Sequence, residues 1–386
     1  MIKPVYLDFN ATTPLDSEVL KAIKPFIEQE FGNPSSTHWF GIAPKRAIEK
    51  ARIQVAEILN CEPTEIIFTS GGTESNNHAI IGTAQSLKHK GNHIITTEIE
   101  HPAVLKVCNH LESHGFSVTR VAVDKDGLVS TSDIKKAITS ETILITVMHT
   151  NNEVGTIEPI EEIARVAKEK EIIIHTDAAQ SVGKIATNVK SLGVDLLSIA
   201  GHKLYAPKGV GALYIRKGIS PNIFMHGAGQ EMGKRAGTEN VLGIVGLGKA
   251  CEVARRDFDT NSARMKKTRD ALLTGLQKGQ PDLRRNGHPE KVLPNTLSVS
   301  FKGLEANRIL EEIGLEIAAS AGAACHSDLV EISHVLLAME LPKHWAKGTI
   351  RFSTGKFTSD SDIETAVRVT LEALKKLVRE KENIHS

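Results

Sequence analysis

Residues 172–215 read IIIHTDAAQSVGKIATNVKSLGVDLLSIAGHKLYAPKGVGALYI, and this stretch decides the fold. It contains three candidate strands, Ile172–His175, Leu196–Ile199 and Gly211–Ile215, which are rich in apolar residues at consecutive positions. Strands that are covered on both faces have this composition, whereas a strand with one solvent-exposed face alternates apolar and polar residues. The stretch therefore predicts buried strands in a sheet that carries helices on both sides.

The same pattern extends toward the N-terminus. Four further candidate strands are Ile66–Thr69, His93–Thr97, Val118–Val123 and Ile143–Met148. Segments of helical period, such as Pro44–Leu59 and Pro159–Lys170, alternate with the strands. This alternation predicts an α/β fold with a mainly parallel, seven-stranded sheet. Ligands bind beyond the carboxyl ends of the strands in such sheets, so the residues that follow each strand are the candidates for function.

The pattern changes near residues 255–292. A charged helix there gives way to a loop at Arg285–Gly287, a candidate strand at Asn295–Phe301, a helix at Glu305–Ile313, a long loop rich in Ala and Ser, and a final helix at Ser361–Glu380. We expect a large α/β domain over residues 15–258, and a smaller α+β domain formed by residues 1–14 and 259–386.

Composition excludes several classes of protein. The 386 residues include 47 Lys+Arg and 46 Asp+Glu, and this near-neutral balance argues against a protein that binds nucleic acid by neutralising phosphates. No apolar stretch reaches the roughly 18 residues of a membrane helix, and the first ten residues carry charges where a signal peptide is apolar. Four cysteines without a C-x-x-C pair are typical of a reduced protein. We expect a soluble cytoplasmic enzyme.

A glycine pair follows the strand Ile66–Thr69. Gly71 and Gly72 let backbone N–H groups approach an anion, and Thr73 adds a hydroxyl at the start of a helical segment. The segment has neither a Walker lysine nor the G-x-G-x-x-G spacing. A phosphate cradle and a plain capped turn are both compatible with these residues alone.

Polar residues follow three other strands. His101 can stack on a flat ring, shuttle protons or simply form surface hydrogen bonds. Asn151 and Asn152 can hold a phenolic oxygen or a carboxylate, or shape a turn. Asp177 follows an apolar strand, so it needs a partner such as a cationic ring nitrogen, unless it caps the next helix.

Lys203 follows the strand Leu196–Ile199 and lies among small residues. A lysine forms an imine when its ammonium is desolvated or lies near another cation, although most lysines are solvated. A phosphate cradle, a stacking His, an acid, an amide and a lysine at successive strand ends together match the needs of pyridoxal 5′-phosphate (PLP).

With these residues in place, the chain resembles the aminotransferase class V family of fold-type-I PLP enzymes, and within it the cysteine desulfurases of the nitrogenase-associated and iron–sulfur-cluster type. The matching stretches are DFNATTP (8–14), GNPSSTH (32–38), FTSGGTESNN (68–77), EIEHPAV (98–104), MHTNNEVG (148–155), HTDAAQSVGK (175–184), GHKLYAPKGVGALYIR (201–216), GAGQEMGKRAGTEN (227–240), SAGAACHSD (320–328) and IRFSTGKFT (350–358). They cover nearly the whole chain in order.

The resemblance implies roles for the residues at these positions. Lys203 would hold PLP covalently and act as a base, and His101 would stack on the ring and exchange a proton near the substrate thiol. Asp177 would bind the pyridine nitrogen, while Gln180 and Asn152 would lie near the cofactor oxygen. The substrate would bind to Asn152 and to Arg351, whose planar guanidinium suits a carboxylate.

The resemblance also implies a phosphate site and a homodimer. Gly72, Thr73 and His202 would contact the phosphate, and Thr238 would reach the phosphate of the neighbouring subunit. The family often has serine where this chain has Ala200. One phosphate hydroxyl would therefore be missing beside the cofactor.

Cys325 lies in Ala318–Ser327, a run of small residues that we expect to be mobile with an accessible thiol, which His326 helps to deprotonate. The resemblance implies that Cys325 takes sulfur from L-cysteine, leaves alanine, and passes its persulfide to an acceptor or scaffold protein for iron–sulfur cluster assembly or thiolation. It also implies that Cys325 can ligate a transferred cluster, although we predict no resident metal. We interpret Cys61, Cys108 and Cys251 as structural thiols.

Three alternatives remain open. A selenocysteine lyase is favoured by AACHSD and by Ala200, whereas Pro-Ala-Val after His101 and the short spacing from Cys325 to Val335 favour a desulfurase. An aminotransferase would share the cofactor site. A non-catalytic adaptor would not need Lys203, Asp177 and Cys325 together.

Overall fold

The computed structural model describes residues 4–280, 282–325 and 330–385. Its largest sheet has seven strands in the order β2-β8-β7-β6-β5-β3-β4. The strands are β2 (Ile66–Thr69), β3 (His93–Thr97), β4 (Ser117–Val121), β5 (Thr142–Thr146), β6 (Ile173–Asp177), β7 (Leu196–Ala200) and β8 (Gly211–Ile215). Strand β8 runs antiparallel to β2 and β7, and the remaining pairs are parallel. The predicted α/β fold with a mainly parallel, seven-stranded sheet is confirmed.

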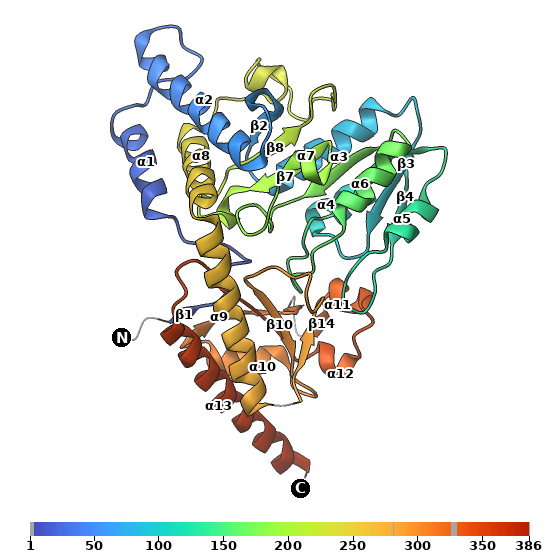
Figure 1. The fold of residues 1–386 in the computed structure, drawn as a ribbon, viewed down its shortest axis with the longest axis vertical. Coiled ribbons are helices and arrows are strands. Elements are labelled where there is room, and N and C mark those ends of the chain that lie inside the picture. Colours follow the sequence, from blue (N-terminus) through green and yellow to red (C-terminus); the bar gives the residue numbers. More distant parts are fainter. Residues whose placement is uncertain (1–3, 281, 326–329, 386) are drawn as a thin grey trace.

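Helices cover both faces of this sheet (Figure 1). One face packs against α2 (Trp39–Leu59), α6 (Ile160–Glu169) and α8 (Val241–Arg256), and the other packs against α3 (Gly72–Ser86) and α4 (Pro102–Glu112). Successive strand residues enter different cores: Ile95 packs with the first group, and its neighbour Ile94 packs with the second. Because both residues are fully buried, the strands need consecutive apolar positions. Three further helices belong to this part, namely α1 (Ser17–Glu28), α5 (Thr131–Ala137) and α7 (Val189–Leu192).

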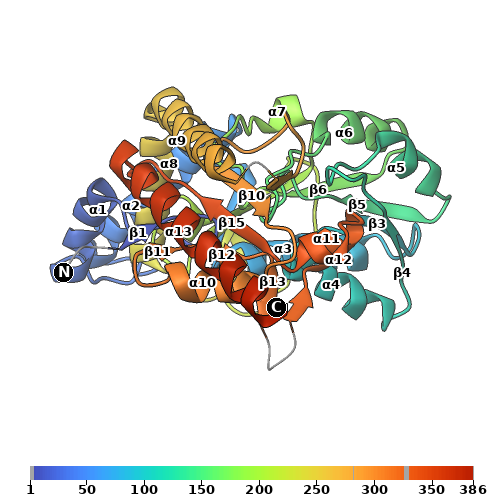
Figure 2. The same ribbon diagram turned by 90° about the horizontal axis from the view of Figure 1, so that it is seen from below.

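A second, smaller sheet has the strand order β12-β15-β10-β9. Its strands are β9 (Arg284–Asn286), β10 (Thr296–Ser300), β12 (Ser320–Ala321) and β15 (Thr349–Ser353). Figure 2 shows α9 (Phe258–Gly279), α10 (Ala306–Ile313) and α13 (Asp360–His385) around these strands. Strand β1 (Val5–Tyr6) pairs in parallel with β11 (Ile317–Ala318), and β13 (Ala323–Cys325) pairs with β14 (Val330–Ile332). Two short helices follow, α11 (His334–Ala338) and α12 (Lys343–Ala346).

The smaller sheet has its own hydrophobic core. Leu7 from the N-terminal segment packs there with Leu272, Phe301 and Leu374. This core supports a division of the chain into residues 15–258 and residues 1–14 with 259–386, because the larger sheet packs around different residues. The boundary itself stays a prediction.

Two segments that we predicted as loops contain strands. Arg285 belongs to β9, a polar edge strand opposite Val299, and the turn comes only at Gly287, whose φ is +85°. The Ala- and Ser-rich segment contains β11, β12 and β13. Small residues are needed there because a Cβ on Gly322 would lie 2.7 Å from Thr349 Cγ2. Close backbone approach explains this composition at least as well as a loop does.

Candidate active site

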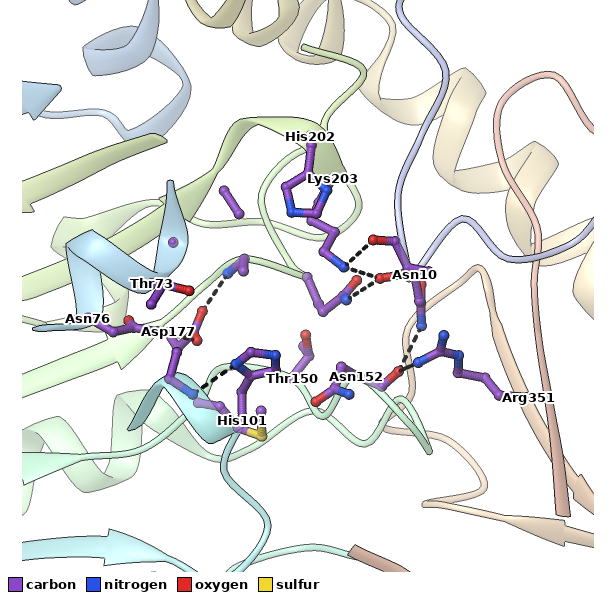
Figure 3. Close-up of a pocket in the computed structure, with 17 residues that line it drawn as sticks. Asn10, Thr73, Asn76, His101, Thr150, Asn152, Asp177, His202, Lys203 and Arg351 are labelled. Atoms are coloured by element: carbon purple, nitrogen blue, oxygen red, sulfur yellow. Dashed lines mark hydrogen bonds between the residues drawn. The ribbon is translucent and has the colours of Figure 1, made fainter. Parts of the chain in front are cut away.

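A cavity of about 300 Å³ lies where the strand ends of the large sheet meet the smaller sheet. This volume is at the lower end of the range of small-molecule sites. Its lining includes these predicted binding residues: Gly72, Thr73, His101, Asn152, Asp177, Gln180, Ala200, His202, Lys203 and Arg351. Figure 3 shows the side chains of Thr73, His101, Asn152, Asp177, His202, Lys203 and Arg351 around one common space. Among the predicted cofactor and substrate residues, Thr238 is the one that does not line it.

Lys203 ends the short 3-10 helix η2 (Gly201–Lys203), which directly follows β7. Its Nζ donates hydrogen bonds to the backbone carbonyls of Asn10 and Ala11, the latter at 2.7 Å. Burial, together with the positive charge of Arg351, lowers the pKa of Lys203 to about 8, although the negative charges of Asp8 and Asp177 act in the opposite direction. A large fraction of this amine is therefore neutral, and thus nucleophilic, near pH 8.

This pKa predicts how the protein takes up its cofactor. The rate at which cofactor-free protein captures PLP is expected to rise with pH through an inflection near 8, because only the neutral Lys203 amine attacks the aldehyde. The Arg351→Met variant should shift the inflection upward, since it removes a cation and leaves Asp8 unpaired near the amine. Stopped-flow absorbance across pH measures both inflections. An inflection near 10.5, the ordinary pKa of a lysine side chain, would contradict the assigned environment of Lys203.

Asp177 is the last residue of β6 and is buried. Its Oδ1 accepts a hydrogen bond from the Ala179 backbone N–H at 2.9 Å, and its Oδ2 accepts one from Asn76 Nδ2 at 2.7 Å. Asp177 thus caps the next turn and also lines the cavity, so the capping role leaves it available to a ligand there. Two donors fix the carboxylate in place, and a cationic ring N–H is a suitable third partner.

His101 is the N-cap of α4, and its ring lies in the cavity (Figure 3). Its Nδ1 accepts a hydrogen bond from the Ala103 backbone N–H at 3.1 Å. Burial lowers the pKa of His101, which favours the neutral ring, and an accepting Nδ1 places the proton on Nε2. His101 therefore offers the cavity a flat ring with a donor at Nε2.

The N-terminus of α3 lies at the cavity, where the sequence predicts an anion cradle. Gly71 has a φ of +153° with ψ at −179°, a conformation that favours glycine, and Gly72 and Thr73 begin the helix. A Cβ on Gly72 would lie 3.2 Å from Ala200 Cβ, so Ala200 packs against the cradle. His202 lines the same cavity, and burial together with Lys203 and two further lysines lowers its pKa to about 4. A neutral His202 can donate one hydrogen bond to a phosphate.

Arg351 lies in strand β15 of the smaller sheet, and it lines the cavity. Its Nη2 donates to Asp8 Oδ1 at 2.8 Å and to Ser320 Oγ at 3.1 Å, and its Nη1 donates to the Asn152 carbonyl at 3.0 Å. These bonds fix the plane of the guanidinium at the cavity wall (Figure 3).

The two neighbouring amides have different tasks. Asn151 is fully buried and shapes the turn after β5, because its Oδ1 accepts from the backbone N–H groups of Glu153 and Val154. Asn152 lines the cavity. The sequence left both tasks open for both residues, and the structure separates them.

Sequence reasoning missed three polar residues that also line the cavity, namely Asn10, Asn76 and Thr150. Asn10 lies in the quoted stretch DFNATTP, and Thr150 directly precedes the amide pair. Asn76 lies one helical turn after Gly72, on the same side of α3, and this spacing was the available signal.

The residues of the cavity fit PLP. Asn76 Oδ1, Thr150 Oγ1 and Arg351 Nε are buried polar atoms without a hydrogen-bond partner in the part of the chain that the structure describes. Such atoms are expected where a polar ligand binds. Together with an amine of lowered pKa, a fixed carboxylate and a helix N-terminus, they provide partners for each polar group of the cofactor.

Thr238 is exposed, in the segment between β8 and α8, which two ion pairs connect to helices α2 and α3. Arg52 and Glu231 form a buried, bidentate pair with both N–O distances at 2.8 Å, and Glu231 also accepts from the Phe68 backbone N–H. Arg235 pairs at 2.8 Å with Glu74 in the first turn of α3. The segment is thus connected to α3 at the predicted anion cradle, but Thr238 itself does not line this cavity.

Cys325 is the last residue of β13, and its backbone pairs with Val330. Its side chain, and His326 as a whole, lie outside the described residues. Ser320, five residues earlier, pairs with Arg351 in the sheet, and its Oγ accepts a hydrogen bond from the Arg351 guanidinium. The segment that leads to Cys325 therefore begins at the cavity wall.

The other three thiols are poor nucleophiles. Burial raises the pKa values of Cys61, Cys108 and Cys251 to about 12 each. The thiolate is the reactive form, so these values support their interpretation as structural residues.

The model of the aminotransferase class-V family matches residues 5–365. The chain is 50% identical to the cysteine desulfurase IscS of Dictyoglomus turgidum over 378 residues, covering 98% of this chain and 96% of the relative. It is similar to the solved structure of a NifS-like protein, with a TM-score of 0.91, 38% identity, and coverage of 97% of this chain and 100% of the other. It is also similar to SspA in complex with cysteine, with a TM-score of 0.79, 36% identity, and coverage of 92% and 99%.

In the described part of the chain, no helix combines the length and the apolar composition that crossing a membrane requires. The family match spans both sheets and every residue of the cavity. The chain therefore belongs to the aminotransferase class-V family of PLP-dependent enzymes.

Proposed function

We propose that this protein is a PLP-dependent cysteine desulfurase, which converts L-cysteine to L-alanine and holds the sulfur as a persulfide on Cys325. The observation that carries the proposal is a single cavity lined by Lys203, Asp177, His101 and Arg351. The near-full-length relative is a cysteine desulfurase, and the solved complex of SspA contains cysteine. These similarities support L-cysteine as the substrate.

Each residue of the cavity has a task in this reaction. PLP, when bound, supplies an electron sink that acidifies the substrate Cα–H. Lys203, with its pKa lowered to about 8, takes and returns that proton. Asp177 holds the ring nitrogen, and Gln180 and Asn152 bind near the cofactor oxygen. Gly72, Thr73 and His202 bind the phosphate, beside the methyl group of Ala200.

The substrate is oriented and cleaved by three further groups. Arg351, with Asn152 at its side, binds the carboxylate through donors that its contacts have already oriented. His101 exchanges a proton with the substrate thiol through Nε2. The Cys325 thiolate then forms a bond to the substrate sulfur while the Cβ–S bond breaks. The electron pair stays on carbon, and proton uptake completes alanine.

The outer sulfur of the Cys325 persulfide is transferred to a partner protein. The persulfide of Cys325 passes to an acceptor or scaffold protein for iron–sulfur cluster assembly or thiolation, and Cys325 can serve there as a transient cluster ligand. The free thiols of Cys61, Cys108 and Cys251 support a reducing, cytoplasmic location.

A homodimer completes the proposal, in which Thr238 reaches the phosphate of the neighbouring subunit. Thr238 is exposed and does not line its own cavity, which supports a role outside its own subunit. Several large apolar side chains in the same segment are also exposed, namely Ile223, Phe224, Met225 and Met232. Exposed apolar residues that cluster in this way are typical of an interface.

The test is the product balance with L-cysteine. The cofactor-loaded protein is expected to form alanine and enzyme-bound persulfide in equal amounts during a first turnover without an acceptor. The keto acid that retains the sulfur, 3-mercaptopyruvate, in place of alanine would identify an aminotransferase, and a colourless protein that takes up no PLP would identify an adaptor. Matched incubations with L-selenocysteine test the lyase alternative, which predicts alanine from selenocysteine and none from cysteine.

A further inference from the structure

Lys184 lies behind the candidate active site, four residues after Gln180. Its side chain is almost completely buried, and its Nζ donates a hydrogen bond to Gln180 Oε1 at 2.9 Å. That amide oxygen is its partner, and no carboxylate among the described residues forms an ion pair with it. A buried ammonium with a neutral partner is unfavourable for stability, so packing alone does not explain a lysine here.

The acid that lines the same small cavity as Lys184 already has partners. Lys184 lines a small enclosed cavity of about 20 Å³ together with Asp16, Lys203 and Lys356. Asp16 accepts hydrogen bonds from Lys356 Nζ and from the Glu18 backbone N–H, one on each oxygen. Burial, together with the charges of Lys203 and Arg351, lowers the pKa of Lys184 to about 7. Lys184 is therefore a buried cation whose position next to Gln180 is not set by a salt bridge.

Hydrogen bonds connect this cation to the reactive amine. Gln180 Nε2 donates to the Asn10 carbonyl at 2.9 Å, and Lys203 Nζ donates to the same carbonyl (Figure 3). The Gln180 amide thus has its oxygen toward Lys184 and its NH₂ group toward the cavity. The ammonium form of Lys184 only donates, and the bond from Gln180 Nε2 to the Asn10 carbonyl holds the same amide orientation when the amine is neutral.

We propose that Lys184 is a positioning residue for cofactor binding, because it holds the Gln180 amide with its NH₂ group facing the cavity. The inference rests on the proposed function, since it takes PLP as the ligand of this cavity. Without Lys184, the Gln180 oxygen would be buried without a donor, and it would recover one only by turning toward the cavity. The site would then present an acceptor where the cofactor oxygen needs a donor.

The test uses the full chain with the variants Lys184→Met, Gln180→Ala and the double variant. Lys184→Met is expected to weaken PLP binding about tenfold, and Gln180→Ala to do the same. The double variant should bind PLP no more weakly than Gln180→Ala, because Lys184 acts through Gln180. Titration of cofactor-free protein, followed by visible absorbance, measures each dissociation constant.

Thermal unfolding of the cofactor-free chain separates positioning from folding. Lys184→Met should unfold at the same or a higher temperature, since it replaces an unpaired buried charge with an apolar side chain of similar length. Lys190→Met, at an exposed lysine, is the matched control and should change neither quantity.

Three results would overturn the inference: unchanged PLP binding by Lys184→Met, a double variant whose loss is the product of the single losses, or a lowered unfolding temperature that accounts for the loss. Wild-type protein that binds no PLP would instead refute the proposed function.

Discussion

The Lys203→Ala variant is expected to lack the visible absorbance band of the cofactor-bound protein and to form alanine from L-cysteine at least about 10²–10⁴-fold more slowly, the usual contribution of one acid–base group. Lys203 has two tasks, covalent attachment of PLP and transfer of the Cα proton, and alanine performs neither. The expected loss is therefore at the upper end of this range or beyond it. Absorbance spectra and alanine quantification measure the two effects separately.

The control for this variant is Lys217→Ala, at an exposed lysine just after β8, which should retain the band and the activity. Borohydride reduction of the wild-type protein, followed by peptide mapping, should place the pyridoxyl group on Lys203. A pyridoxyl group on another lysine, or a band that persists in Lys203→Ala, would refute the assignment of the amine.

The Cys325→Ala variant is expected to retain the visible band but to form no persulfide, with turnover of L-cysteine reduced about 10³-fold or more, as for other lost nucleophiles. The two variants separate cofactor chemistry from sulfur transfer, because Lys203 binds PLP and Cys325 accepts the sulfur. Persulfide is measured by alkylation and mass spectrometry after a single turnover.

Cys61→Ala is the matched control, since burial raises the pKa of that thiol to about 12 and leaves it protonated. It should form persulfide on Cys325 at the wild-type level. Undiminished turnover by Cys325→Ala would contradict the relay through this thiol, and would favour a lyase that releases sulfur or selenium directly.

The sequence predicts the large sheet well because its strands are buried on both faces. Ile94 and Ile95 enter different cores, so neighbouring positions must both be apolar, and the strand is visible without any alignment. Strand β9 was missed for the opposite reason, since Arg284 and Arg285 are polar residues on an edge strand. Its pairing with β10 depends on partners more than ten residues away, which no local pattern reveals.

The candidate site divides in the same way. Asp177 and Lys203 each lie at a strand end, so strand prediction placed both at one edge of the sheet. Asn10 and Lys184 show no such signal. Asn10 comes from the N-terminal segment and contacts Lys203 only after the chain has folded back, while Lys184 resembles any solvated lysine until its burial is known.

The sequence alone thus determined the sheet, the strand-end residues and the family, because apolar runs and the residues that follow them are local features of the chain. Only the tertiary structure decided the electrostatics of the site. The pKa of Lys203, the separate tasks of Asn151 and Asn152, and the contact of Lys184 with Gln180 all depend on burial and on neighbours distant in sequence. Desolvation and charge interactions vary with distance in space, and the order of residues in the chain does not specify that distance.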